Sequence, residues 1–197
     1  MVDVIDIIQE RKELPQFLER DGLIGIELGV AGGWYSKRLM EGGLFKALYG
    51  VDIYGDHHNT KEYIKALKNI GMGQNYWLLR MTFEDALDAF PDEHFDFVYI
   101  DGYAHTGEER GKTMFDWLKK VKVGGMIAGH DYHEKWPLVQ TCVDALGEEL
   151  SQPVMRTQMS KKRDPQDQFP SWAMFKESAE VPDYPDRLRK LPKKLRG

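Results

Sequence analysis

Two apolar segments of the chain end in side chains that can handle protons or bind metal ions. Asp101 ends the first segment, and His130 with Asp131 ends the second. If both segments are neighbouring strands of a parallel sheet, their carboxyl ends meet at one edge and the three side chains converge. Carboxylates with an imidazole bind divalent metals, and the same groups can remove a proton. His105, which follows Asp101 closely, is a second candidate base, whereas helix capping and interior packing are the structural alternatives.

A glycine-rich turn, residues 27–33 (ELGVAGG), lies between an apolar segment and a helix-like one. Glycine lets a backbone approach a ligand closely, and the helix that follows offers free N–H groups. Glu27 stands where the dinucleotide fingerprint G-x-G-x-x-G has its first glycine, which counts against a nicotinamide cofactor. Asp52, near the end of the next strand, can accept hydrogen bonds from two ribose hydroxyls. A turn without a ligand and a purely structural aspartate stay open as alternatives.

Apolar, β-prone segments alternate with segments of helical periodicity along most of the chain. The predicted strands are residues 23–28, 47–54, 75–82, 95–102, 125–132, 153–158 and 171–176. Helices are predicted for residues 4–20, 35–43, 60–70, 82–90, 106–121 and 137–150. This alternation is typical of βαβ units, and only a loop joins the last two strands, which predicts a hairpin. We therefore expect an α/β fold with a doubly wound, mostly parallel sheet and a terminal antiparallel hairpin.

Length and charge predict one domain with a basic tail. The chain has 197 residues and a net charge of −5, so we expect one domain over residues 1–178 and no general affinity for nucleic acid. Residues 179–197 form a proline-containing tail, expected to be extended, whose last part is rich in lysine and arginine. A single cysteine, Cys142, excludes an internal disulfide framework. Because no membrane span or secretory signal is visible, we expect a cytoplasmic location.

The motifs together resemble those of class I S-adenosylmethionine-dependent methyltransferases. The resemblance is carried by Glu27-Leu28-Gly29 with Gly33, Ile100-Asp101-Gly102 with His105, Gly124-Gly125, and Gly129-His130-Asp131-Tyr132. The most similar group is the small sugar and macrolide O-methyltransferases related to macrocin O-methyltransferase. The resemblance covers about residues 20–176 and implies the seven-stranded Rossmann-like sheet of that class.

The resemblance also implies where ligands bind. S-adenosylmethionine would lie against Glu27, Gly29, Gly33, Asp52, Met81, Thr82, Phe83 and Asp101. Asp52 would hold the ribose, and residues 81–83 would border the adenine. In catechol-type relatives the matching positions bind magnesium, so the resemblance implies a divalent metal at Asp101, His130 and Asp131. An imidazole in this set favours manganese or another transition metal over magnesium.

The resemblance implies methyl transfer to an oxygen of a small acceptor such as a sugar, with Asp101, His105 and His130 as catalytic candidates. A basic loop at residues 160–170 suits a nucleotide-sugar, although a solvated loop is the simpler interpretation. Two rival functions stay open: a nicotinamide-dependent oxidoreductase on a similar sheet, and a non-catalytic cofactor- or nucleic-acid-binding module. We expect no membrane partner, and a homo-oligomer stays open.

Overall fold

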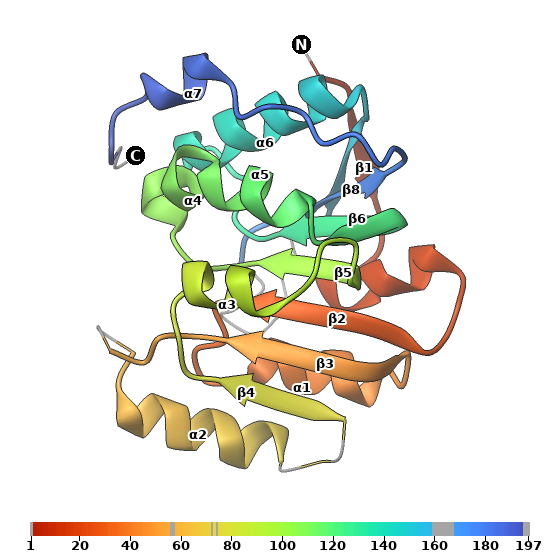
Figure 1. The fold of residues 1–197 in the computed structure, drawn as a ribbon, viewed down its shortest axis with the longest axis vertical. Helices are drawn as coiled ribbons and strands as arrows, with labels where there is room; N and C mark the ends of the chain where they lie inside the picture. Colours follow the sequence, from red (N-terminus) through yellow and green to blue (C-terminus); the bar gives the residue numbers. More distant parts are fainter. Residues whose placement is uncertain (1, 56–57, 72, 74, 159–167, 195–197) are drawn as a thin grey trace.

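The computed structural model describes residues 2–55, 58–71, 73, 75–158 and 168–194. Within this part, eight strands form one sheet in the order β1-β7-β8-β6-β5-β2-β3-β4 (Figure 1). The strands are β1 (Val4–Ile7), β2 (Leu23–Leu28), β3 (Phe45–Val51), β4 (Tyr76–Leu79), β5 (Phe95–Ile100), β6 (Val121–Gly129), β7 (Val154–Thr157) and β8 (Trp172–Lys176). Neighbouring strands are parallel except where β8 pairs with β6 and β7. The predicted doubly wound fold with its terminal antiparallel hairpin is therefore confirmed.

Helices cover both faces of the sheet. They are η1 (Arg11–Leu18), α1 (Trp34–Glu41), α2 (Thr60–Ile70), α3 (Phe83–Ala89), η2 (Ala104–Thr106), α4 (Gly107–Arg110), α5 (Lys112–Leu118), α6 (Pro137–Leu150) and α7 (Asp186–Arg189). In Figure 1, α3, α5 and α6 lie in front of the sheet and α1 lies behind it. None of the helices in the described ranges is long and apolar enough to cross a membrane.

Alternation along β5 explains why helices are needed on both sides. Phe97 and Tyr99 belong to the core that packs η1 and α1, whereas Val98 and Ile100 belong to the core that packs α3, α5 and α6. Every residue of β5 is buried. Such a strand is stable only in the middle of a sheet that is covered on both faces. β5 therefore lies between β6 and β2 in the middle of the sheet.

The predicted helix over residues 4–20 is wrong. Residues 4–7 (VIDI) form β1, which pairs in parallel with β7 and adds one strand to the seven that were expected. β-branched residues favour strands, and the edge of β7 offers free backbone groups. Residues 11–18 form the 3-10 helix η1, which contains Pro15.

The predicted single helix over residues 106–121 is also wrong. The backbone from Gly107 to Gly111 has positive φ at every residue, so α4 is a left-handed turn that separates η2 from α5. Glycine at both ends of this turn adopts the left-handed conformation readily. Right-handed helix is confined to the shorter α5, and β6 starts at Val121.

The C-terminal segment is not fully extended as expected. It contains α7, and the Leu188 side chain is only 1% exposed, packed in the core beside α5 and α6. The boundary between a domain at 1–178 and a tail at 179–197 stays a prediction.

Candidate active site

Two cavities meet at the carboxyl ends of the central strands. One has a volume of about 300 Å³ and the other about 30 Å³. Both are lined by Gly29, His58, Asp101 and Gly102, so they are two parts of one hollow, which we call the central cleft. Open parallel sheets of this type bind their ligands at this edge.

The glycine turn after β2 forms the floor of the central cleft. Gly29 has φ +93°, and a Cβ built on it would lie 2.0 Å from the carbonyl oxygen of Asp101. Glycine is therefore required for β2 and β5 to end this close together. Gly33, also predicted to bind the cofactor, is absent from the lining of the cleft and packs against Ile70 of α2, so its contact with the cofactor stays a prediction.

Asp52 ties the end of β3 to the glycine turn. Its Oδ2 accepts hydrogen bonds from the backbone N–H groups of Val30 and Ala31 at 3.1 and 2.9 Å. Its Oδ1 accepts one from Tyr54 N–H at 3.1 Å. The side chain also lines the smaller part of the cleft. The structural and the ligand-binding interpretations of Asp52 are thus compatible.

Glu27 lies in the wall of the larger part of the cleft and is 1% exposed. It accepts a hydrogen bond from Ser36, whose hydroxyl also lies 2.9 Å from Tyr76 Oη. Burial raises the pKa of Glu27 to about 8, although the bond from Ser36 lowers it. The carboxyl is therefore largely protonated at neutral pH and can donate as well as accept a hydrogen bond.

Residues 81–83, predicted to border an adenine, line the smaller part of the cleft. Thr82 caps α3, because its hydroxyl accepts a hydrogen bond from Asp85 N–H at 3.0 Å. A Cβ on Gly102 would lie 2.5 Å from the Phe83 ring, so the glycine after Asp101 lets the two loops approach. The predicted residues that follow β4 and β5 therefore lie close together at the cleft.

Asp101, His130 and Asp131 converge as the sequence predicted. His130 Nδ1 lies 3.2 Å from Asp131 Oδ1 and 3.7 Å from Asp101 Oδ1. Burial lowers the pKa of His130, but the two carboxylates outweigh burial and leave that pKa above its ordinary value. His130 Nε2 is buried and has no hydrogen-bond partner among the described residues. His105, on η2, lies outside this cluster and outside the lining of the central cleft.

Arg11 completes the cleft and was missed by the sequence analysis. Its guanidinium is 6% exposed and its Nη1 lies 3.3 Å from Asp101 Oδ2. The same group lies over the Tyr35 ring, 4.6 Å from its centroid. Ninety positions separate Arg11 from Asp101, so no local pattern in the sequence could have linked them.

The predicted metal site has suitable donors but an unsuitable charge. One donor atom each from Asp101, His130 and Asp131 lie within 4.8 Å of one another. The guanidinium of Arg11, however, already carries a fixed positive charge beside Asp101. A second cation at the same carboxylate would meet like-charge repulsion at a partly buried site. This arrangement does not fit a resident divalent metal.

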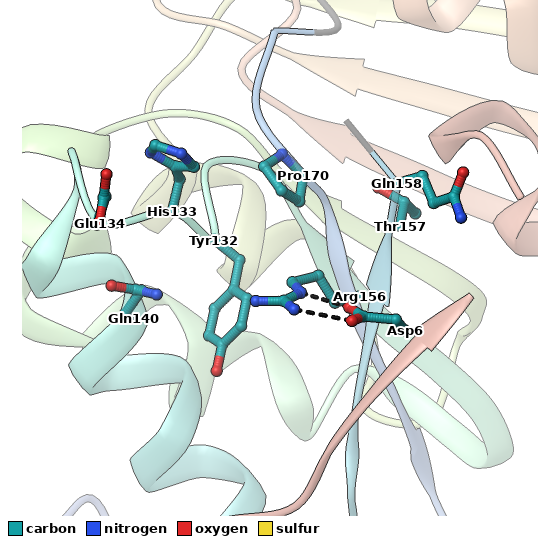
Figure 2. Close-up of a pocket in the computed structure, with 9 residues that line it drawn as sticks. All are labelled: Asp6, Tyr132, His133, Glu134, Gln140, Arg156, Thr157, Gln158 and Pro170. Atoms are coloured by element: carbon teal, nitrogen blue, oxygen red, sulfur yellow. Dashed lines mark hydrogen bonds and ion pairs between the residues drawn. The ribbon is translucent and has the colours of Figure 1, made fainter. Parts of the chain in front are cut away.

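A further cavity of about 520 Å³ is lined by residues of β1, α6 and β7 and of the loop after β6 (Figure 2). It is lined by Asp6, Tyr132, His133, Glu134, Gln140, Arg156, Thr157, Gln158 and Pro170. Tyr132 follows Asp131 in the sequence, but no described residue lines both this cavity and the central cleft. Arg156 donates two hydrogen bonds of 2.6 and 2.9 Å to Asp6. The Asp6 carboxylate therefore neutralises the positive charge of Arg156. We call this space the side cavity.

A family model described as a methyltransferase domain matches residues 23–132, from β2 to the loop after β6. The chain belongs to this family. The matched stretch contains the glycine turn, Asp52, residues 81–83 and the whole Asp101–His130–Asp131 cluster. The predicted enzyme class, an S-adenosylmethionine-dependent methyltransferase, is therefore confirmed. Arg11 and the side chains of β7 lie outside the match.

Solved structures of methyltransferases share the fold. The N-methyltransferase NodS from Bradyrhizobium japonicum is 14% identical with a TM-score of 0.62, over 85% of this chain and 95% of its own. An O-methyltransferase from Bacillus cereus is 17% identical with a TM-score of 0.62, over 84% and 78%. An rRNA methylase from Streptococcus thermophilus is 19% identical with a TM-score of 0.59, over 87% and 99%. No curated protein matches the chain significantly.

Proposed function

We propose that this methyltransferase binds S-adenosylmethionine in the central cleft and methylates an oxygen of a small hydroxylated acceptor such as a sugar. One observation carries the proposal. Gly29, Asp52, Met81 and Asp101 come from the ends of four adjacent strands and line one continuous hollow. A nucleoside with an amino-acid arm requires such an elongated site across strand ends.

The cofactor would lie along the cleft from β4 to β2. Residues 81–83 would border the adenine, Asp52 would accept hydrogen bonds from the ribose hydroxyls, and Glu27 and Gly29 would face the methionine arm. Asp101 would accept a hydrogen bond from the ammonium group of that arm. The smaller part of the cleft has room for only a few waters, so side chains such as Ile53 and Phe83 must move to admit the adenine.

The chemistry would be an in-line displacement. The acceptor oxygen attacks the sulfonium methyl, the carbon–sulfur bond breaks, and the sulfur keeps the electron pair as S-adenosylhomocysteine leaves. His130 Nε2 would take the hydroxyl proton, because Nδ1 is directed at Asp131 and Nε2 has no partner in the described structure. Asp131 would stabilise the imidazolium that forms. His105 stays the rival base, although it lies outside the cluster.

The acceptor would occupy the side cavity, whose lining includes Tyr132, the residue that follows Asp131 in the sequence. Figure 2 shows amide, carboxylate and imidazole groups around this space, from Gln140, Gln158, Glu134 and His133. Such a mixture of donors and acceptors suits a polyhydroxylated molecule. Its arginine is paired with Asp6, which favours an uncharged acceptor over a nucleotide-sugar. The basic loop predicted to bind an anion lies largely outside the described residues. Membership of the macrocin-like group rests on the sequence motifs alone.

The test is calorimetric titration with S-adenosylmethionine, S-adenosylhomocysteine and NAD. We expect both sulfur compounds to bind and NAD not to bind. Asp52→Ala should weaken both affinities by roughly 10- to 100-fold, since it removes hydrogen bonds to a charged acceptor. Asp88→Ala, an exposed position on α3, is the matched control and should change nothing.

Two outcomes would contradict the proposal. Binding of NAD without either sulfur compound would favour the oxidoreductase. Full cofactor affinity in a folded Asp52→Ala variant would remove the ribose assignment. The methyl-transfer step itself is tested by supplying S-adenosylmethionine with neutral saccharides and following S-adenosylhomocysteine release, with His130→Ala as the inactive variant.

A further inference from the structure

Arg11 is held rigidly at the wall of the central cleft. It starts η1, whose first turn has a capping box between Glu10 and Glu13. Its backbone carbonyl accepts a hydrogen bond from Tyr35 Oη at 3.0 Å, and its guanidinium lies over the same tyrosine ring. The Tyr35 ring in turn packs on Tyr99 of β5, with centroids 4.2 Å apart. The guanidinium is therefore fixed relative to the carboxyl end of β5.

Arg11 faces a cluster that contains two carboxyl groups and one imidazole. Asp101 and Asp131 contribute two carboxylates, and His130 lies between them. Buried charges need a partner, and Arg11 Nη1 is 3.3 Å from Asp101 Oδ2. Arginine cannot lose its proton in proteins, so this charge is permanent. Among the described residues that line the larger part of the cleft, no lysine or second arginine is present.

We propose that Arg11 is a positioning residue that takes the electrostatic place of a divalent cation, orienting Asp101 and keeping metal ions out of the cluster. This role rests on the proposed function, methyl transfer in the central cleft. It implies that this methyl transfer needs no metal ion. The donors of the cluster have a spacing that a metal would accept, so the guanidinium is what decides between the two cations.

The proposal is tested by titrating Mn²⁺ into the wild-type protein and into Arg11 variants, by calorimetry and by electron paramagnetic resonance of free Mn²⁺. We expect no saturable binding to the wild type at millimolar Mn²⁺. Arg11→Gln should bind Mn²⁺ at least about tenfold more tightly, because a unit charge beside the site is gone. Adding Asp131→Asn to that variant should abolish the gain, which places the ion in the cluster. If Arg11 had a purely structural role, its replacement by glutamine would not create a metal site.

Two further variants control for charge and for folding. Arg11→Lys keeps the charge and should exclude Mn²⁺ as the wild type does. Lys12→Gln removes an exposed charge from the same helix and should also match the wild type. Thermal unfolding of each variant checks the fold, and if Arg11→Gln does not fold, Arg11→Met, which keeps an aliphatic side chain beside the Tyr35 ring, replaces it in the titration.

The proposal is overturned if the wild type binds Mn²⁺ with micromolar affinity that Asp131→Asn removes. It is also overturned if folded Arg11→Gln binds Mn²⁺ no more tightly than the wild type. Titration of the same wild-type sample with S-adenosylmethionine keeps the two proposals separate. Loss of cofactor binding there would count against the proposed function alone, whatever the manganese result.

Discussion

The Glu108 side chain stabilises the loop that follows β5 by hydrogen bonding. The residue is 4% exposed, and its Oε1 accepts hydrogen bonds from the N–H groups of Gly102 and Tyr103 at 3.3 and 2.8 Å. Its other oxygen is buried without a partner among the described residues. Burial raises the pKa of Glu108 to about 8. The native structure therefore favours the neutral acid at a position next to Asp101.

This raised pKa makes stability depend on pH. The unfolded chain releases the Glu108 proton near pH 4.5, whereas the folded protein keeps it until about pH 8. The folded state binds more protons in this window, so the free energy of unfolding falls as pH rises through it. We expect Glu108→Gln, which keeps a carbonyl acceptor, to weaken that fall by at most about 1.4 kcal/mol per pH unit. Urea unfolding at pH 5, 7 and 9 measures it.

Glu27 has a similarly raised pKa and stays in both proteins, so the comparison isolates Glu108. Equal pH dependence in the variant and the wild type would mean that Glu108 is charged in the folded state. A variant that is less stable at every pH by the same amount would point to lost packing instead.

For single residues, the sequence predicts a functional role when the interacting partners are close in the chain or when the residue ends a strand of a recognisable fold. Gly29 and Asp52 were found because a strand end and a glycine turn have recognisable local patterns. Arg11 and Glu108 were missed because nothing local distinguishes them from solvated charges. Arg11 acts through its contact with Asp101, and Glu108 acts through its hydrogen bonds to the loop 101–103. Only the fold brings these partners together.

The element that departs most from its local sequence pattern is the left-handed turn at α4. Glu108, Glu109 and Arg110 have φ of 52°, 58° and 61°. A left-handed conformation costs a non-glycine residue roughly 1–2 kcal/mol. Contacts on both sides hold the turn, since Gly107 packs on Leu138 of α6 and Gly111 packs near Cys142. Helical periodicity in residues 106–121 gives no hint of this strain, which explains the wrong prediction.

A glycine substitution tests this conformation directly. Glu109 is exposed, and its backbone N–H bond to Thr106 survives any change of side chain. We expect Glu109→Gly to raise the free energy of unfolding by up to about 1 kcal/mol, since glycine adopts positive φ without strain. In a right-handed helix the same change would lower it by a similar amount. The sign of the change in urea unfolding therefore distinguishes the two backbones.

The matched control for that experiment is Glu84→Gly in the first turn of α3, an exposed position in a right-handed helix. It should be destabilising. If both substitutions destabilise alike, the left-handed turn at residues 107–111 is wrong.

At the scale of the whole molecule, the C-terminal segment closes the helical layer. Leu188 enters the core beside Gly111 and Cys142, and Tyr184 Oη donates to the carbonyl of Arg110 at 2.9 Å. Arg187 pairs with Glu148 and Glu149 of α6 at 2.9 and 3.1 Å. Part of the basic segment thus meets the acidic body of its own chain. The sequence predicted its charge but not its packing, because three leucines scattered among prolines, lysines and arginines are a weak apolar signal.

Packing and charge in this segment can be separated by two variants. Leu188→Ala removes a fully buried side chain and should lower the free energy of unfolding by about 2–4 kcal/mol, which lowers Tm by roughly 5–10 °C. A triple variant with alanine at Lys190, Lys193 and Lys194 removes exposed charge and should leave Tm nearly unchanged. If instead the triple variant unfolds early while Leu188→Ala does not, the segment acts through its charges. Salt-dependent retention of RNA by the wild type, lost in the triple variant, would then favour a nucleic-acid partner.

Because Leu188 packs on the turn that carries Glu108, we further expect Leu188→Ala to weaken cofactor binding through the loop at Asp101. Calorimetric titration of the variant with S-adenosylmethionine measures this effect.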